Sequence, residues 1–263
     1  MTKPSLSLGG ARGGARGQGH ECGTVRLTSV LTIGFPAVVA GTNCYILAPG
    51  AGEECLIVDP GAGVTGQLAE LLSEHRLRPA AVLLTHGHFD HVYSVTPVCD
   101  SAGVAAYIHG EDRYRLKDPL SDVGPELIAM LEQQFGQKAS WQEPTDLVTL
   151  VDGQSLTIAG LDLRVLHAPG HTQGSVLFAL PEVPESIAAD AGVRSTVLSG
   201  DVLFAGSIGR TDLAGGDGAA MNRSLRDVIL PLADDVLVLP GHGPATTIER
   251  ERATNPYLQG LGA

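Results

Sequence analysis

Short apolar runs separated by polar turns recur along the chain from residue 25 onward. Runs of a few apolar or alternating residues predict strands, whereas leucines spaced for one helical face predict a helix. The turns Pro49-Gly50 and Asp59-Pro60-Gly61 are expected to end two of the strands. The first half is therefore expected to hold strands at 25–33, 43–47, 55–58, 80–84 and 103–108, and helices at 66–76, 92–102 and, irregularly, across 110–136.

The second half repeats this rhythm of strands followed by helices. Residues 181–194 are polar enough to be an exposed hairpin connection. Two halves of strands flanked by helices predict two sheets packed face to face with helices outside, an α/β fold of the four-layer αββα sandwich type. The expected strands are 147–151, 155–158, 161–166, 175–180, 195–198 and 236–239, and the expected helices are 219–232 and 246–252.

The first 24 residues differ in composition from the rest. They hold several glycines with Arg12 and Arg16 and almost no apolar side chains that could form a core. Such a segment buries too little apolar surface to offset its loss of conformational entropy. We therefore expect a flexible tail at 1–24 and a folded domain at 25–263.

Overall composition narrows the class of protein. Of the 263 residues, 43% are hydrophobic and 17% charged, and the formal net charge is −12. This acidic balance argues against nucleic-acid and anionic-membrane partners, because both need clustered Lys and Arg. No apolar stretch is long enough to span a bilayer and no secretion signal is recognisable, so a cytoplasmic location is expected. The four cysteines lack the CxxC spacing of a zinc site and indicate no disulfide framework.

The segment from Thr85 to His91 has the densest chemistry in the chain. It holds three imidazoles and one carboxylate, from His86, His88, Asp90 and His91. Neutral imidazole nitrogens and carboxylate oxygens are ligands for zinc, iron and manganese. The segment directly follows the apolar run 81–84, so a strand end would direct these ligands into one cavity.

Three further ligand candidates have the same setting. Each follows an apolar run and a glycine, which allows the backbone to turn sharply over a sheet edge. A single histidine in this position is more often a surface or core residue, but the recurrence at several strand ends favours one shared metal site. The candidates are His171, Asp201 and His242.

The motifs THGHFDH, PGHT, SGD and PGHG, in this order, resemble the metallo-β-lactamase superfamily over nearly all of residues 25–257. The resemblance implies a dinuclear centre, with zinc expected and iron or manganese as alternatives. A hydroxide bridging the two ions would attack the substrate carbonyl, and Asp90 would orient it. The implied ligands are His86, His88 and His171 for one metal, Asp90, His91 and His242 for the other, Asp201 as the bridge, and Asp59 as a hydrogen-bond partner of a ligand.

Within that superfamily, the segments 200–204 (GDVLF), 207–212 (SIGRTD) and 251–257 (ERATNPY) resemble glyoxalase II, the hydroxyacylglutathione hydrolases. This resemblance implies hydrolysis of a small-molecule thioester, S-lactoylglutathione or a related hydroxyacyl thioester. Arg210 matches the basic residue that contacts the glutathione carboxylate in that family. Its alternative role is structural, bonding carbonyl groups or the nearby Asp212.

The chain departs from glyoxalase II in two respects. It ends about twenty residues after His242, without that family's C-terminal helical domain, and Asp212 stands where a tyrosine is usual. An acidic Asp212 beside the cleft disfavours an anionic tripeptide, so another thiol carrier, another ester or a lactone is also open. The segment 110–136, with Arg113, Tyr114 and Arg115, is either a source of substitute contacts or an ordinary solvated helix.

Four other functions occur on similar motifs or folds, and the sequence disfavours each of them. A persulfide dioxygenase uses one iron bound by two His and one Asp, whereas the intact second ligand set here favours hydrolysis. The GRTD and TNPY segments argue against a true β-lactamase, and residues 202–241 leave no room for the inserted domain of RNA-processing members. A binding module without catalysis would be expected to have lost ligands, and all seven are present.

Overall fold

The computed structural model describes residues 29–188 and 190–261, so the tail predicted at 1–24 lies outside the described residues. Most of the described strands form two sheets. The first sheet has seven strands in the order β10 (Val183–Pro184), β1 (Ser29–Pro36), β2 (Asn43–Ala48), β3 (Glu54–Val58), β4 (Arg78–Leu83), β5 (Ala106–His109) and β6 (Leu147–Leu150). The second has six, in the order β15 (Thr246–Thr247), β14 (Val236–Pro240), β11 (Ser195–Gly200), β9 (Val176–Leu180), β8 (Leu161–His167) and β7 (Ser155–Ile158).

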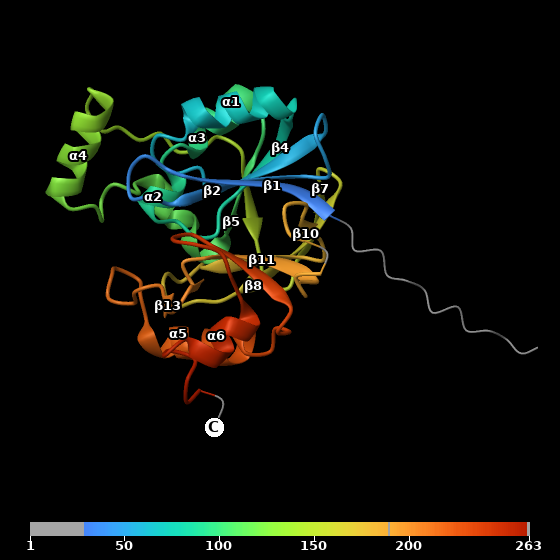
Figure 1. The fold of residues 1–263 in the computed structure, drawn as a ribbon. Coiled ribbons are helices and arrows are strands. Elements are labelled where there is room, and N and C mark those ends of the chain that lie inside the picture. Colours follow the sequence, from blue (N-terminus) through green and yellow to red (C-terminus); the bar gives the residue numbers. More distant parts are fainter. Residues whose placement is uncertain (1–28, 189, 262–263) are drawn as a thin grey trace, which may run out of the picture.

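Helices cover the outer face of each sheet, which gives the predicted four-layer αββα sandwich (Figure 1). On the first sheet lie α1 (Thr65–His75) and α3 (Val95–Ala102), with the short α2 (Phe89–Val92) close by. On the second lie α5 (Gly218–Ser224), continued by the π-helical turn η2 (Leu225–Ile229), and α6 (Ile248–Thr254). The 3-10 helix η1 (Gly110–Lys117) and α4 (Pro125–Phe135) follow β5, and α4 stands at one side of the molecule.

The alternation of side chains along β3 shows why the layers form. Leu56 and Val58 face the second sheet and pack in one buried cluster with Phe178 of β9. Cys55 and Ile57 point the other way and pack with α1 and α3. Successive side chains of a strand point to opposite faces, so a continuous apolar run predicts a strand covered on both faces.

Three local features differ from the sequence prediction. The connection 181–194 contains β10, which pairs in parallel with β1, so it is not only an exposed loop. Thr246 and Thr247 pair with β14 before α6 begins, where a helix from 246 was predicted. A small hairpin of β12 (Leu203–Phe204) and β13 (Ser207–Ile208) was not predicted, because strands of two residues have no readable period.

Parallel pairing brings the ends of distant strands to one edge of the sandwich. In the first sheet Val58 of β3 pairs with Leu83 of β4, so the residues after both strands emerge together. In the second sheet Gly200 of β11 pairs with Pro240 of β14. Three of the predicted ligand segments, after β4, β11 and β14, and the turn of Asp59 after β3 therefore start at paired strand ends. Over the described ranges, the helices are all too short or too polar to cross a membrane.

Candidate metal centre

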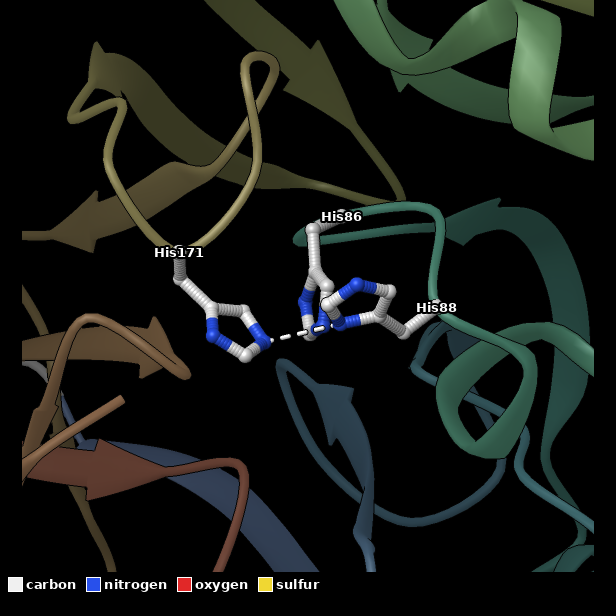
Figure 2. Close-up of side chains that lie close together, drawn as sticks. All are labelled: His86, His88 and His171. Atoms are coloured by element: carbon white, nitrogen blue, oxygen red, sulfur yellow. Dashed lines mark hydrogen bonds between the residues drawn. The ribbon is translucent and has the colours of Figure 1, made fainter. Parts of the chain in front are cut away.

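Three of the predicted ligands converge from two loops. His86 and His88 follow β4, and His171 lies in the loop between β8 and β9 (Figure 2). Nδ1 of His88 lies 2.8 Å from Nε2 of His171, and the His86 and His171 ring centroids are 4.7 Å apart. One nitrogen from each ring lies within 4.8 Å of the other two, close enough to share one ion.

The other predicted set forms a second cluster beside the first. Asp90 and His91 lie in α2, and His242 follows β14. Nε2 of His242 lies 3.2 Å, and Nε2 of His91 3.6 Å, from Oδ2 of Asp90. These three residues also offer ligand atoms within 4.8 Å of one another.

Asp201 stands between the two clusters, directly after β11. Its Oδ2 lies 3.5 Å from Nε2 of His171 and 3.5 Å from Nε2 of His242. Its Oδ1 lies 3.3 Å from Nε2 of His91. One carboxylate thus reaches members of both clusters, which is the position a bridging ligand needs. All seven predicted ligands are brought together.

Orphaned buried atoms test whether cations fit this cavity. Among the described residues, five buried side-chain atoms lack a hydrogen-bond partner: Nε of Arg115 and Oε2 of Glu182, and three that agree with the metal prediction, Nε2 of His86, Nε2 of His91 and Oδ1 of Asp201. Leaving buried polar atoms unpaired costs free energy, about 1–3 kcal/mol each. The last three belong to the predicted ligand set, and each can offer a lone pair to a cation. The residues therefore fit divalent metal ions, and an N/O set suits zinc, iron or manganese.

Asp59 orients two of the histidines through their Nδ1 atoms, one directly and one through Thr85. Its Oδ2 lies 2.9 Å from Nδ1 of His91 and accepts a hydrogen bond from the Thr85 hydroxyl at 2.6 Å. Because that hydroxyl donates to Asp59, its oxygen can accept from Nδ1 of His86, 3.1 Å away. His86 then carries its proton on Nδ1 and turns the lone pair of Nε2 toward the cavity, and His91 does the same once its Nε2 has lost its proton.

Burial and charge divide the histidines into two electrostatic groups. Burial lowers the pKa of His86 and His171 and lowers the pKa of His88 to about 3, so these rings are neutral. Burial also opposes the charged form of His91, but Asp201, Asp90 and Asp59 outweigh it and raise the pKa of His91 well above its usual value. A hydrogen bond to Asp90 similarly raises the pKa of His242.

Asp90 is surrounded by groups that favour its ionised form. Burial alone would raise the pKa of this carboxyl, but His91 and His242 lower it overall. The hydroxyl of Thr42, which sequence reasoning missed, also donates to Oδ2 of Asp90 at 2.8 Å. A carboxylate held in this way keeps its position and its charge.

Asp112 ties the two histidine loops together and was also missed from the sequence. The residue lies in η1 and is fully buried. Its Oδ2 accepts from the backbone N–H of Gly87 at 2.8 Å and from the Thr172 hydroxyl at 2.7 Å. Its Oδ1 accepts from the N–H of Gly174 at 2.8 Å, and a Cβ on Gly174 would lie 2.7 Å from Cγ of Asp112. One carboxylate therefore fixes the loop of His86 and His88 to the loop of His171.

Arg210, the predicted substrate contact, touches the site through its backbone. Its carbonyl oxygen lies 2.8 Å from Nδ1 of His171 and fixes that ring's orientation. Its guanidinium is exposed and forms two hydrogen bonds with Asp212, at 2.7 and 2.8 Å. This pairing holds the pKa of the Asp212 carboxyl down to about 2. The alternative considered from the sequence, a bond to Asp212, is thus observed.

A cavity of about 830 Å³ opens onto the two clusters. Ligand pockets in proteins commonly measure roughly 300–1,000 Å³, so a small organic substrate fits. The cavity reaches His88, Asp90, His171, Asp201 and His242 at its base. Hence a carbonyl group in this cavity can lie beside both clusters.

The fold and ligand set define a metal-dependent hydrolase, and sequence comparison agrees. Residues 37–242 match the sequence model of the metallo-beta-lactamase superfamily. The chain belongs to this superfamily.

Individual relatives extend over most of the chain. An uncharacterized protein of Mycobacterium tuberculosis is 44% identical over 88% of this chain and 99% of its own length. The hydroxyacylglutathione hydrolase GloC of Haemophilus influenzae is 33% identical over 73% of this chain and 82% of its own length. The crystal structure of BLEG-1, a B3 metallo-beta-lactamase, superposes with a TM-score of 0.70 at 36% identity, covering 88% of this chain and all (100%) of that one.

Proposed function

We propose that this metal-dependent hydrolase cleaves a thioester, with S-lactoylglutathione or a related hydroxyacyl thioester as the substrate. The observation that carries the proposal is the pair of ligand clusters, joined by Asp201, at the base of one cavity. When bound, two divalent ions would lower the pKa of a water molecule to about 7 and polarise the substrate carbonyl. The similarity to GloC supports the choice of a thioester.

The ligands divide between the two ions as their clusters suggest. His86, His88 and His171 would hold one ion, Asp90, His91 and His242 the other, and Asp201 would bridge them. The outer partners of these rings support the assignment. Asp59 and the carbonyl of Arg210 engage Nδ1 of His91 and His171 and leave Nε2 free to bind a cation.

Asp90 is proposed to orient the attacking water as well as to bind metal. As an ionised carboxylate it accepts a hydrogen bond from that water and aims an oxygen lone pair at the carbonyl carbon. The Thr42 hydroxyl, which donates to Oδ2 of Asp90, holds this carboxylate in place for the task. The water oxygen forms the new C–O bond, the C–S bond then breaks, and the proton lost by the water ends on the released thiolate by way of solvent, so the products are an acid and a thiol. Thiolate leaves readily enough that no dedicated general acid is required.

The test is thioester hydrolysis by purified protein loaded in turn with zinc, iron or manganese. Its metal content is measured before each assay. We expect loss of the thioester absorbance with S-lactoylglutathione, and a large loss of activity in a His88→Ala variant. Protein with full metal content that cleaves no thioester would overturn the proposal.

Two rival reactions are measured on the same sample. The likeness to BLEG-1 makes β-lactam hydrolysis a rival, and nitrocefin turnover detects it. A persulfide dioxygenase would instead consume oxygen with glutathione persulfide while bound to one iron. If either rival reaction has a higher kcat/KM than thioester hydrolysis, that reaction would replace the proposed one. A kcat/KM for the thioester above both rival values supports the proposal.

A further inference from the structure

Two separate parts of the fold contribute apolar side chains to the lining of the cavity beside the ligand clusters. One wall is formed by the segment between η1 and α4 and the first turns of α4, with Pro119, Val123 and Leu127. The facing wall is formed by the β12–β13 hairpin and the loop after it, with Phe204, Ile208 and Leu213. Apolar walls favour apolar ligands because contact removes both surfaces from water.

This apolar surface reaches the predicted metal ligands. The Phe204 ring packs edge-on against His242, with ring centroids 6.0 Å apart. Phe89, which lies between His88 and Asp90 in the sequence, is buried and also lines the cavity. An apolar chain attached to the reacting carbonyl would therefore remain in apolar surroundings up to the scissile bond.

The arginines that line the cavity already have carboxylate partners. The Arg210 guanidinium donates two hydrogen bonds to the carboxylate of Asp212, from Nε and from Nη2. Nε of Arg115 lies 3.6 Å from Oδ1 of Asp112, and its Nη1 lies 3.4 Å from Oδ2 of Asp122. Its Nη2 donates to the carbonyl oxygen of Ala214 at 2.6 Å. An incoming carboxylate would have to compete with these partners, so its gain in Coulomb energy is small.

The other charged side chains of the walls, Lys117 and Asp118, add no net positive charge to the cavity lining. Lys117 and Asp118 are adjacent in sequence, both are exposed, and both line the cavity. Their charges cancel over a short distance. The walls around the ligand clusters therefore offer little net positive charge to a peptide-like anion such as glutathione.

We infer, on the basis of the proposed thioester hydrolysis, that S-lactoylglutathione is hydrolysed less efficiently than thioesters with an uncharged, apolar acyl chain and an uncharged thiol, which are the preferred substrates. The two apolar walls bind the chain, and the Arg210–Asp212 pair removes the positive charge that an anionic thiol carrier would need. Each methylene fully buried in the cavity is expected to raise kcat/KM up to about fourfold.

A chain-length series tests the inference. Zinc-loaded protein is assayed with acetyl, butanoyl, hexanoyl and octanoyl thioesters of N-acetylcysteamine, a neutral thiol, and with S-lactoylglutathione. We expect kcat/KM to rise by about twofold to fourfold per methylene. The hexanoyl and octanoyl thioesters should have a higher kcat/KM than S-lactoylglutathione. A flat series, or S-lactoylglutathione as the best substrate, would overturn this inference and leave thioester hydrolysis standing. Full metal content with no thioester cleaved would refute the proposed function itself.

A matched pair of variants tests the apolar wall. Val123 lines the cavity, whereas Val151 is 57% exposed and does not line it. Val123→Asn should flatten the dependence of kcat/KM on chain length, and Val151→Asn should keep the wild-type slope. Equal slopes for the two variants would contradict the binding of the chain along this wall.

Another pair tests the charge pairing. Asp212→Asn releases the Arg210 guanidinium, so the ratio of kcat/KM for S-lactoylglutathione to that for the hexanoyl thioester should rise about twofold to fivefold. The rise should vanish at 1 M salt and in the double variant Asp212→Asn with Arg210→Gln, because both remove the exposed charge interaction. A ratio that does not change in Asp212→Asn would refute the role given to this pair.

Discussion

Oδ2 of Asp59 lies 2.9 Å from Nδ1 of His91, and both side chains are buried. The same oxygen accepts from the Thr85 hydroxyl, and Oδ1 accepts from the Thr85 N–H at 2.8 Å. Asp59 follows β3, and Thr85 follows its parallel neighbour β4. This carboxylate therefore joins two strand ends and sets the orientation of a proposed ligand in each metal cluster, His91 directly and His86 through Thr85.

Replacing Asp59 with asparagine should weaken metal binding without emptying the space. Oδ1 can still accept from the Thr85 N–H, so the amide nitrogen takes the place of Oδ2 beside His91. Nδ1 of His91 must then accept, its proton moves to Nε2, and the lone pair for the metal is lost. We expect metal affinity to fall about 10–100-fold, measured by equilibrium dialysis against zinc.

The matched control for Asp59→Asn is a carboxylate that bonds a hydroxyl far from the site. Oδ1 of Asp162 accepts from the exposed Thr157 hydroxyl at 2.7 Å within the β7–β8 hairpin. Asp162→Asn should retain wild-type zinc affinity. Equal affinity in the Asp59 and Asp162 variants would show that Asp59 does not control the His91 tautomer.

Asp112→Asn should destabilise the protein before any metal is added. Three donors surround this carboxylate, and an amide in either orientation turns an NH₂ group toward at least one of them. A buried donor facing another donor costs about 1–3 kcal/mol, so the free energy of unfolding of the metal-free protein should fall by that amount. Urea unfolding measures it. An unchanged free energy of unfolding would mean that the two histidine loops are held by other contacts.

The ligand set was predictable because each ligand follows an apolar run and a turn. The recurrence of an apolar run and a glycine turn favoured one shared site for His86, Asp201 and His242, and the structure places these residues together. The sandwich was predictable because the chain repeats one rhythm in two halves, each of strands flanked by helices. The role of Asp59 was expected only from the resemblance to the superfamily, because a turn alone does not mark a hydrogen-bond partner of a ligand.

The supporting residues were harder to find because no sequence pattern marks them. Asp112 is one acidic residue in an irregular helical stretch, and only the fold brings Gly87 and Gly174 to it. Thr42 lies in a turn 48 residues before Asp90. Pairs brought together by tertiary packing have no fixed spacing. The close pairing of Arg210 with Asp212 is local, and the sequence did raise it as an alternative.

Metal binding to the metal-free protein should release protons at neutral pH. The pKa of His91 is raised well above its ordinary value of 6.5, so this ring stays protonated at neutral pH. A metal can bind only a nitrogen that has lost its proton. Lowering the pH therefore favours the protonated ring and should weaken metal binding, and raising the pH should strengthen it. Zinc titration calorimetry at pH 7 in buffers of different ionisation enthalpy measures the released protons. A heat that is identical in every buffer would contradict a protonated His91.

His242→Ala should separate the two clusters. It removes one ligand from the cluster of Asp90 and His91 but leaves His86, His88 and His171 intact. We expect the bound metal to fall from two ions toward one per chain, measured by elemental analysis after dialysis, with a large loss of thioester hydrolysis. His75→Ala, outside both clusters at the end of α1, is the control and should keep both ions. Two retained ions in His242→Ala would refute the assigned division of ligands.

A single methyl group at Gly241 should disturb the bridging position. This glycine follows β14, and a Cβ there would overlap Oδ1 of Asp201 and lie 2.7 Å from Cε1 of His91. Gly241→Ala must therefore displace the carboxylate or the ring. Overpacking of this kind costs about 1–3 kcal/mol, so the variant should fold with reduced metal content and activity. Gly66→Ala, in the first turn of α1 with open space around the added carbon, should keep wild-type metal content. Circular dichroism and elemental analysis of both variants measure the outcome, and full metal content in Gly241→Ala would show that Asp201 does not need its observed position to hold the ions.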